Sequence, residues 1–299
     1  MRANEACVRD ERLQENVWLL SLKTPTLAPA TATNTLVLGK ERIVVIEPAT
    51  PYPAEQTRLF ALLDALQAEG REIVALCLTH HHVDHIGAIE RLRDRYQAPI
   101  VAEARTAARL DFSVDRVLDG SLADLDGSAK LPWSCDLGGG MALEALFTPG
   151  HSDGHLIFWE QQTQVAYGGD LVASEGTILI NPEDGGDMAA YVASLRRCIR
   201  HFEAVNAQLI PSHGAPIGEP VAILERYVAH RLARESRVMA GLRSGCDRYD
   251  ALLAYTYADV ADVPWGLAAL SLDAHLFKIK AEATGTIPKH DEFMKFQKA

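Results

Sequence analysis

Long apolar segments are missing from this sequence of 299 residues. No stretch approaches the ~18 consecutive apolar residues that a membrane-spanning helix needs. The N-terminus, MRANEACVRDERLQENV, is charged and contains no apolar core of the kind found in secretory signals. We therefore expect a cytoplasmic protein that has no membrane anchor.

Cysteine is scarce, and its pattern contains no close pair. The five cysteines are odd in number and scattered: Cys7, Cys77, Cys135, Cys198 and Cys246. Disulfide frameworks and thiolate metal sites use paired, closely spaced cysteines. We expect these five to be reduced, buried thiols.

Basic residues are in the minority. The chain holds 29 Lys and Arg against 40 Asp and Glu, so its formal net charge is −11. This excludes a uniformly basic protein that coats nucleic acid, although it leaves room for a local basic groove. Apolar residues make up 48% and charged residues 23%, which is typical of a folded globular protein. The length predicts one large domain or two unequal ones.

Short β-type runs and helical stretches alternate over the first 218 residues. We expect strands at 17–22, 35–38, 42–46, 73–78, 100–102, 141–147, 156–159, 164–167 and 209–210. Helices are expected at 54–69 and 86–96, and from an N-cap at Asp187 to about Phe202. Because several strands follow one another directly, two sheets covered by helices fit better than one doubly wound sheet.

The character of the sequence changes after Pro220. Helices are expected at 221–242, 249–257 and 265–282, followed by an extended end. Three helices and a short ribbon predict a small winged-helix-like domain at 219–299, after a catalytic domain at 1–218. The third helix has no Lys or Arg before Lys278, so we do not expect it to read DNA bases.

Four good metal ligands stand within six residues directly after the strand expected at 73–78. His80, His82, Asp84 and His85 form the pattern His-x-His-x-Asp-His. With 11 histidines in the chain, chance produces this pattern in about one such sequence per thousand. In an extended segment residues i and i+2 point the same way, so His80 and His82 can bind one ion. Asp84 and His85, at the following turn, can reach a second ion.

One loop cannot complete two coordination spheres, so further ligands should follow other strands. His151 follows the strand expected at 141–147, Asp170 follows 164–167, and His213 follows 209–210. Each candidate lies in a turn that contains Gly or Pro, which lets the backbone approach a crowded site.

In order and spacing these seven residues resemble the metal-binding motifs of the metallo-β-lactamase-fold hydrolase superfamily, over about residues 15–215. The resemblance implies an α/β (α+β) fold, an αββα sandwich with its metals at one edge. It assigns one metal to His80, His82 and His151. It assigns a second metal to Asp84, His85 and His213, with Asp170 bridging the two metals. Imidazole and carboxylate ligands without thiolates suit two Zn²⁺, with Mn²⁺ or Fe²⁺ as alternatives.

Such a pair of ions lowers the pKa of a shared water toward 7, which supplies a bridging hydroxide as nucleophile. We expect Asp84 to orient this nucleophile as well as to bind metal, and we identify no general acid for the leaving group. Glu47 stands where the family usually has Asp. It is expected to hydrogen-bond a ligand histidine, the alternative being an ordinary solvated glutamate.

The C-terminal part resembles the lactamase-beta-2 family, which joins a winged-helix-like domain to the sandwich and includes single-strand endoribonucleases. This resemblance is carried by the following motifs: Asn34-Thr35, Asp153-Gly154-His155, Gly185-Gly186-Asp187, His230-Arg231-x-x-Arg234-Glu235 and Ala274-His275-Leu276.

Three residues are candidate substrate contacts: His155, Tyr191 and His230. Each also has an ordinary explanation, as a packing or core residue. The arginines at 226, 231, 234 and 237 are expected to form a solvated helix face with ion pairs such as Arg231–Glu235. A strip that binds phosphates is the alternative. Residues 174, 177 and 181–186 are expected to form part of the pocket wall.

The leading hypothesis is a dinuclear metal-dependent hydrolase that acts on phosphodiesters of single-stranded RNA. The competing hypothesis is a hydrolase of small-molecule thioesters or lactones, similar to glyoxalase II, which the acidic net charge favours. A mononuclear iron dioxygenase would use only part of the ligand set, and a catalytically silent nucleic-acid-binding protein would leave that set unexplained.

Overall fold

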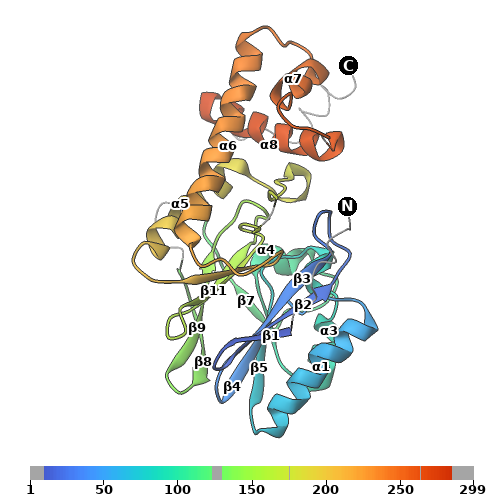
Figure 1. The fold of residues 1–299 in the computed structure, drawn as a ribbon, viewed down its shortest axis with the longest axis vertical. Coiled ribbons are helices and arrows are strands. Elements are labelled where there is room, and N and C mark those ends of the chain that lie inside the picture. The colour runs from blue at the N-terminus through green and yellow to red at the C-terminus, as the bar shows by residue number, and fades with distance from the viewer. Residues whose placement is uncertain (1–9, 123–129, 175, 263, 285–299) are drawn as a thin grey trace.

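The computed structural model describes residues 10–122, 130–174, 176–262 and 264–284 (Figure 1). The first sheet contains β1 (Asp10–Gln14), β2 (Val17–Lys23), β3 (Ala32–Leu38), β4 (Arg42–Ile46), β5 (Glu72–Cys77), β6 (Ile100–Glu103) and β7 (Arg116–Leu118). The second contains β8 (Lys130–Gly138), β9 (Met141–Phe147), β10 (Leu156–Glu160), β11 (Val165–Gly169) and β12 (Gln208–Pro211). The helices are α1 (Pro53–Ala68), α2 (Val83–Ile86), α3 (Ile89–Tyr96), α4 (Ala104–Arg109), η1 (Pro182–Asp184), α5 (Met188–Phe202), α6 (Pro220–Arg243), α7 (Tyr249–Thr256) and α8 (Trp265–Thr284).

The two sheets pack face to face with helices on both outer sides, so the predicted αββα sandwich is confirmed (Figure 1). The central core lies between the sheets and includes Leu36, Val44, Leu143 and Phe158. A second core joins the outer face of the first sheet to α1 and α3. A third joins the outer face of the other sheet to α5 and the first half of α6.

The direction of the strands brings several loops to one edge of the sandwich. In the first sheet β4, β5 and β6 run parallel, and in the second β11 and β12 run parallel, with Tyr167 opposite Ile210. Strands β9 and β11 both pair antiparallel with β10 and therefore point the same way. The turns that follow β5, β9, β11 and β12 consequently meet.

Most expected elements are present, with β9 at the predicted bounds and Asp187 capping α5 by accepting from Ala190 N. The single helix expected at 86–96 is instead divided into α2 and α3. The sequence analysis did not predict β1, α4, β7 and β8. Strand β8 contains Pro132, which argues against a strand in the sequence although an edge strand tolerates it. Helix α4 and strand β7 are too short to show periodicity.

The three expected C-terminal helices are present as α6, α7 and α8. Their small core contains Val238, Leu252, Tyr257, Ala268 and Leu272. The terminal ribbon lies outside the described residues, so the winged-helix assignment stays a prediction, as does a boundary at 218/219. The first half of α6 packs on the sandwich, because its residues Ile223, Leu224 and Tyr227 belong to the core under α5.

Cys77 and Cys198 are buried free thiols, as expected, whereas Cys135 and Cys246 are only partly buried. Cys7 lies outside the described residues. Among the described residues, no helix combines the length and the hydropathy that crossing a bilayer requires.

Candidate metal centre

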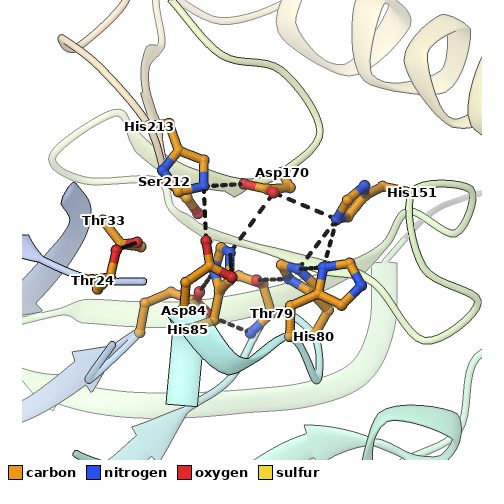
Figure 2. Close-up of polar contacts among 12 residues, drawn as sticks. Thr24, Thr33, Thr79, His80, Asp84, His85, His151, Asp170, Ser212 and His213 are labelled. Carbon is orange, nitrogen blue, oxygen red and sulfur yellow. Dashed lines mark hydrogen bonds and ion pairs between the residues drawn. The ribbon is translucent and has the colours of Figure 1, made fainter. Parts of the chain in front are cut away.

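The seven predicted ligands come together at one edge of the sandwich (Figure 2). The turn after β5 and the short helix α2 supply four of them, and the turns after β9, β11 and β12 each supply one.

The glycines of these turns are sterically necessary at two places. Gly150 has φ +140°, and a Cβ there would lie 2.2 Å from Tyr191 Cα. Gly169 has φ +55°, and a Cβ there would lie 2.5 Å from His155 Nε2.

The first cluster consists of three imidazoles and one carboxylate. His80 Nε2 lies 2.9 Å from His82 Nδ1, and His151 Nε2 lies 3.3 Å and 3.1 Å from those two atoms. Asp170 Oδ2 lies 3.4 Å from His151 Nε2. A tetrahedral zinc with bonds of about 2.0–2.1 Å separates its ligand atoms by about 3.3 Å, so these spacings suit one such ion.

The second cluster consists of Asp84, His85 and His213. His85 Nε2 lies 3.5 Å from Asp84 Oδ1, and His213 Nε2 lies 3.6 Å from Asp84 Oδ2. Asp170 reaches this cluster too, with Oδ1 3.4 Å from His213 Nε2 and Oδ2 3.7 Å from His85 Nε2. Asp170 thus stands between the clusters, in the place of the bridging ligand that the family resemblance implies.

The facing ring nitrogens and carboxylate oxygens of the two clusters fit cations placed between them. His151 Nδ1 faces the carbonyl oxygen of Leu179, which can only accept, so the proton sits on Nδ1 and Nε2 carries a lone pair. In the same way His82 Nε2 donates to Asp184, which leaves a lone pair on Nδ1. With these tautomers, lone pairs on His82 Nδ1 and His151 Nε2 face one another at 3.1 Å, as two ligands of one cation would. His85 Nε2 and Asp170 Oδ1 are also buried without a hydrogen-bond partner.

Each remaining ligand histidine is likewise fixed through its outer nitrogen. His80 Nδ1 pairs with Thr79 Oγ1 at 2.9 Å, and His213 Nδ1 donates to the carbonyl oxygen of Ala32 at 3.0 Å. Asn34 on β3 holds the His213 turn, because its Nδ2 donates to the carbonyl oxygens of Pro211 and Gly214. Such outer contacts set the tautomer and the direction of a ligand ring.

Glu47 contacts the second cluster through His85. It is fully buried, and Oε2 accepts from His85 Nδ1 while Oε1 accepts from Thr79 N at 2.6 Å. Its backbone has φ 57°, a conformation unusual for Glu, and is held by hydrogen bonds to Cys77 and Thr35. The alternative of a solvated glutamate is wrong. Its function as support for a ligand stays a proposal.

We expect Glu47→Gln to reduce kcat/KM by about 10–100-fold. If the amide oxygen keeps the Thr79 contact, the NH₂ group faces His85 Nδ1 and drives the imidazole proton to Nε2, where a cation would bind. Titration with zinc should show a loss at one of two sites. Glu47→Asp, which keeps the charge, is the matched variant and should retain more activity. A Glu47→Gln protein with normal zinc affinity would contradict this interpretation.

The electrostatics differ between the two clusters. Burial holds the pKa of His80 well below its ordinary value and lowers the pKa of His151 to about 4. Burial also opposes charge on His85, but Glu47, Asp170 and Asp84 outweigh it and raise its pKa to about 10. Against a similar effect of burial, Asp170 raises the pKa of His213. His80 and His151 are therefore neutral at pH 7, while His85 holds a proton that a cation must displace.

The three candidate substrate contacts lie in different surroundings. His155 is fully buried, pairs with Thr148 Oγ1 and accepts from the backbone N of Asp170, so it holds that ligand in place. Tyr191 is fully buried and donates to the carbonyl oxygen of Leu171, as a core tyrosine does. His230 is exposed on α6. These positions give His155 and Tyr191 structural partners, and a contact with substrate stays a prediction for all three.

The arginine row on α6 is not the solvated face that we expected. Arg231 is 3% exposed and donates to the carbonyl oxygen of Ile178, and Glu235 pairs with Lys278 instead of Arg231. Arg234 and Arg237 both donate to the carbonyl oxygen of Thr256 at the end of α7. Three of the four arginines are thus bound within the protein, because α6 packs between the sandwich and α7.

Two polar residues near the ligands were not singled out from the sequence. Asp184 accepts from His82 Nε2 and from His81 Nε2, each at 2.9 Å, and the bond from His82 is the main cause that holds the pKa of Asp184 well below its usual range. Asp184 lies in the segment 181–186, which was expected to line the site, but nothing in its sequence marked it as a partner of His82. His81 is the third member of this group.

The family model for the metallo-beta-lactamase superfamily matches residues 28–201. The chain is 25% identical over 295 residues to a beta-lactamase-like protein 2 homolog of Caenorhabditis elegans, which covers 96% of this chain and 90% of that protein. It is 27% identical over 216 residues to an atrochrysone carboxyl ACP thioesterase of Aspergillus fumigatus, covering 71% and 60%. A hydroxyacylglutathione hydrolase of Bdellovibrio bacteriovorus is 26% identical over 136 residues, 46% of each chain.

Solved structures share the fold over nearly the whole length. A beta-lactamase domain protein from Burkholderia ambifaria has a TM-score of 0.70 at 16% identity and covers 94% of this chain and 91% of its own. A metallo-beta-lactamase family protein from Thermus thermophilus has a TM-score of 0.68 at 19% identity and covers 91% and 95%. Since the family model spans more than half of the sequence, this chain belongs to the metallo-beta-lactamase superfamily.

Proposed function

We propose that this hydrolase is a dinuclear, zinc-dependent enzyme that cleaves small-molecule thioesters or related acyl compounds. The observation that carries the metal assignment is the convergence of three ring nitrogens, on His80, His82 and His151, within 3.3 Å of one another and beside the Asp170 carboxylate. Two buried atoms without partners, His85 Nε2 and Asp170 Oδ1, support a second ion beside the first.

The residues of the centre would have different roles in hydrolysis. Two bound cations would lower the pKa of a shared water and polarise the substrate carbonyl. Asp170 faces both clusters and sets their separation. Asp84 is 14% exposed at its side chain, and its free lone pairs can orient an attacking water. The outer hydrogen bonds keep the five imidazoles from turning away, so the arrangement is formed before substrate binds.

Three observations favour an acyl substrate over RNA. The net charge of −11 repels a polyanion such as RNA, whereas it does not repel a neutral ester. Arg231, Arg234 and Arg237, the residues that a phosphate strip would need, are bound to carbonyl oxygens inside the protein. Two of the relatives carry thioesterase or hydroxyacylglutathione hydrolase names.

A substrate panel tests the proposal. Zinc-loaded protein would be incubated with acyl thioesters of glutathione and of N-acetylcysteamine, with lactones, and with labelled single-stranded RNA. We expect thiol release from at least one thioester and loss of that release in His82→Ala. Cleavage of RNA alone, abolished by the same substitution, would overturn the acyl assignment and support a nuclease. Activity that survives His82→Ala would come from a contaminant and would contradict both.

The pKa values of His85 and His151 predict that the second metal site is more sensitive to pH than the first. His85, with a pKa of about 10, must lose its proton before Nε2 can bind a cation, so affinity at its cluster should rise about tenfold per pH unit between pH 6 and 8. His151, with a pKa of about 4, is already neutral in that range. Calorimetry in buffers of different ionisation enthalpy should detect proton release for one ion and little for the other. Equal release for both would contradict the prediction.

A further inference from the structure

The segment of residues 178–184, which we call the strap, contacts two ligand histidines of the first cluster. The carbonyl oxygen of Leu179 accepts from His151 Nδ1 at 2.8 Å. At the other end of the strap, Asp184 Oδ2 accepts from His82 Nε2 at 2.9 Å. The strap therefore sets the tautomers of both imidazoles whose lone pairs face one another.

The strap is built to keep its shape. Ile178 and Ile180 are buried in the core under α5, with 5% and 0% exposure. Asn181 closes the turn that carries Asp184, since its Oδ1 accepts from Glu183 N at 3.0 Å and its carbonyl oxygen accepts from Asp184 N at 3.1 Å. Movement of this turn would move the Asp184 carboxylate away from His82.

The C-terminal helices α6 and α8 also contact the strap. Arg231 of α6 donates through Nη2 to the carbonyl oxygen of Ile178, and its guanidinium lies 5.3 Å from the ring of Tyr191. Helix α8 contacts η1, the end of the strap that carries Asp184. Arg231 is 3% exposed, and its Nε has no partner among the described residues. Burying a charge in this way is costly, so its contact with the strap needs an explanation.

We propose that Asp184 and Arg231 are positioning residues of the metal centre. Asp184 directs the lone pair of His82 Nδ1 at the cation, and Arg231 holds the strap where Leu179 and Asp184 meet His151 and His82. The C-terminal helices thereby support the first metal site without touching it. This inference rests on the proposed metal-dependent function.

Metal affinity, measured without any substrate, tests the inference. The dissociation constants of both ions would be determined on the full chain by competition with a chromogenic zinc chelator. We expect Asp184→Ala to weaken the first site by about 10–100-fold and to leave the second within about twofold. Asp184→Asn, which keeps one acceptor oxygen, should lose less. Arg231→Met should weaken the first site by about three- to tenfold, with partial recovery in Arg231→Lys.

Two matched controls separate positioning from general stability. Arg234→Met removes a neighbouring arginine of α6 that contacts α7 instead of the strap. Asp153→Asn alters a carboxylate that shares Arg109 with Asp184, and no hydrogen bond joins it to a ligand histidine among the described residues. Both should bind zinc as the unaltered chain does. In the double variant Asp184→Ala/Arg231→Met, the combined loss should be smaller than the product of the single losses, because both act through the strap.

The possible failures are distinguishable. An unaltered chain that binds no zinc would overturn the proposed function itself. Two ions bound normally by the unaltered chain and by Asp184→Ala would overturn the inference alone. Equal losses in Arg231→Met and Arg234→Met would also overturn it, since they would show a general effect of α6. Circular dichroism would verify folding, and if Arg231→Met does not fold, Arg231→Lys and Asp184→Asn decide the outcome.

Discussion

Asp170→Asn should reduce kcat/KM on the order of 10³-fold and leave fewer than two zinc ions per chain. The carboxylate faces His151 and His85 with one oxygen and His213 with the other, at 3.4 to 3.7 Å. An amide offers one oxygen, and its NH₂ hydrogens would point at one of the two cations. Steady-state kinetics on the best thioester, with metal analysis of the same sample, measures both effects.

The size of this effect depends on Asp170 serving both clusters. Asp153→Asn removes a nearby carboxylate bonded to Arg109, so it should keep two zinc ions and nearly normal kcat/KM. An Asp170→Asn protein with two ions and activity within tenfold of the unaltered chain would remove the bridging role. Loss of one ion with normal turnover would show that a single site performs the reaction.

Removal of the ions should lower the thermal midpoint of unfolding by about 10–20 °C. Each cation present at 100 times its dissociation constant stabilises the folded state by about 2.7 kcal/mol. Two such ions contribute about 5 kcal/mol, and each kcal/mol is worth about 2–4 °C for a chain of this size class. Calorimetric scans with and without a chelator, and after zinc is restored, measure the shift.

The fall in the thermal midpoint on chelation should depend on the predicted metal ligands. In His82→Ala the chelator should cause a much smaller shift, because one of the two sites is already lost. Magnesium added back in place of zinc should restore little, since imidazole-rich sites prefer zinc. A chelator shift below about 2 °C in the unaltered chain would mean that bound ions contribute little to the folded state, contrary to this view of the centre.

Much of the centre was readable from local sequence because its ligands follow apolar strands. His80 and His82 extend a buried strand, so their spacing of two residues places both rings on one side. His151, Asp170 and His213 each follow a short apolar run at a Gly or Pro turn, and strand direction then brings those turns together. The direct succession of several strands likewise predicted two sheets, which the structure confirms.

Hydrogen-bond partners that lie far apart in the chain could not be predicted from local sequence. His82 and Asp184 are 102 positions apart, and Arg231 and Ile178 are 53 apart. Helical spacing made Arg231 look solvated, but spacing does not reveal which face another element will cover.

The type of the candidate ligands and their positions after strand ends were therefore determined by the sequence alone, because both are local properties. Of the residues that contact those candidate ligands from outside, Glu47 was expected from the sequence, whereas Asp184 and Arg231 were revealed only by the tertiary structure. Their contacts arise from packing between separate elements, and hydrogen bonds require an approach within about 3 Å that no sequence spacing specifies.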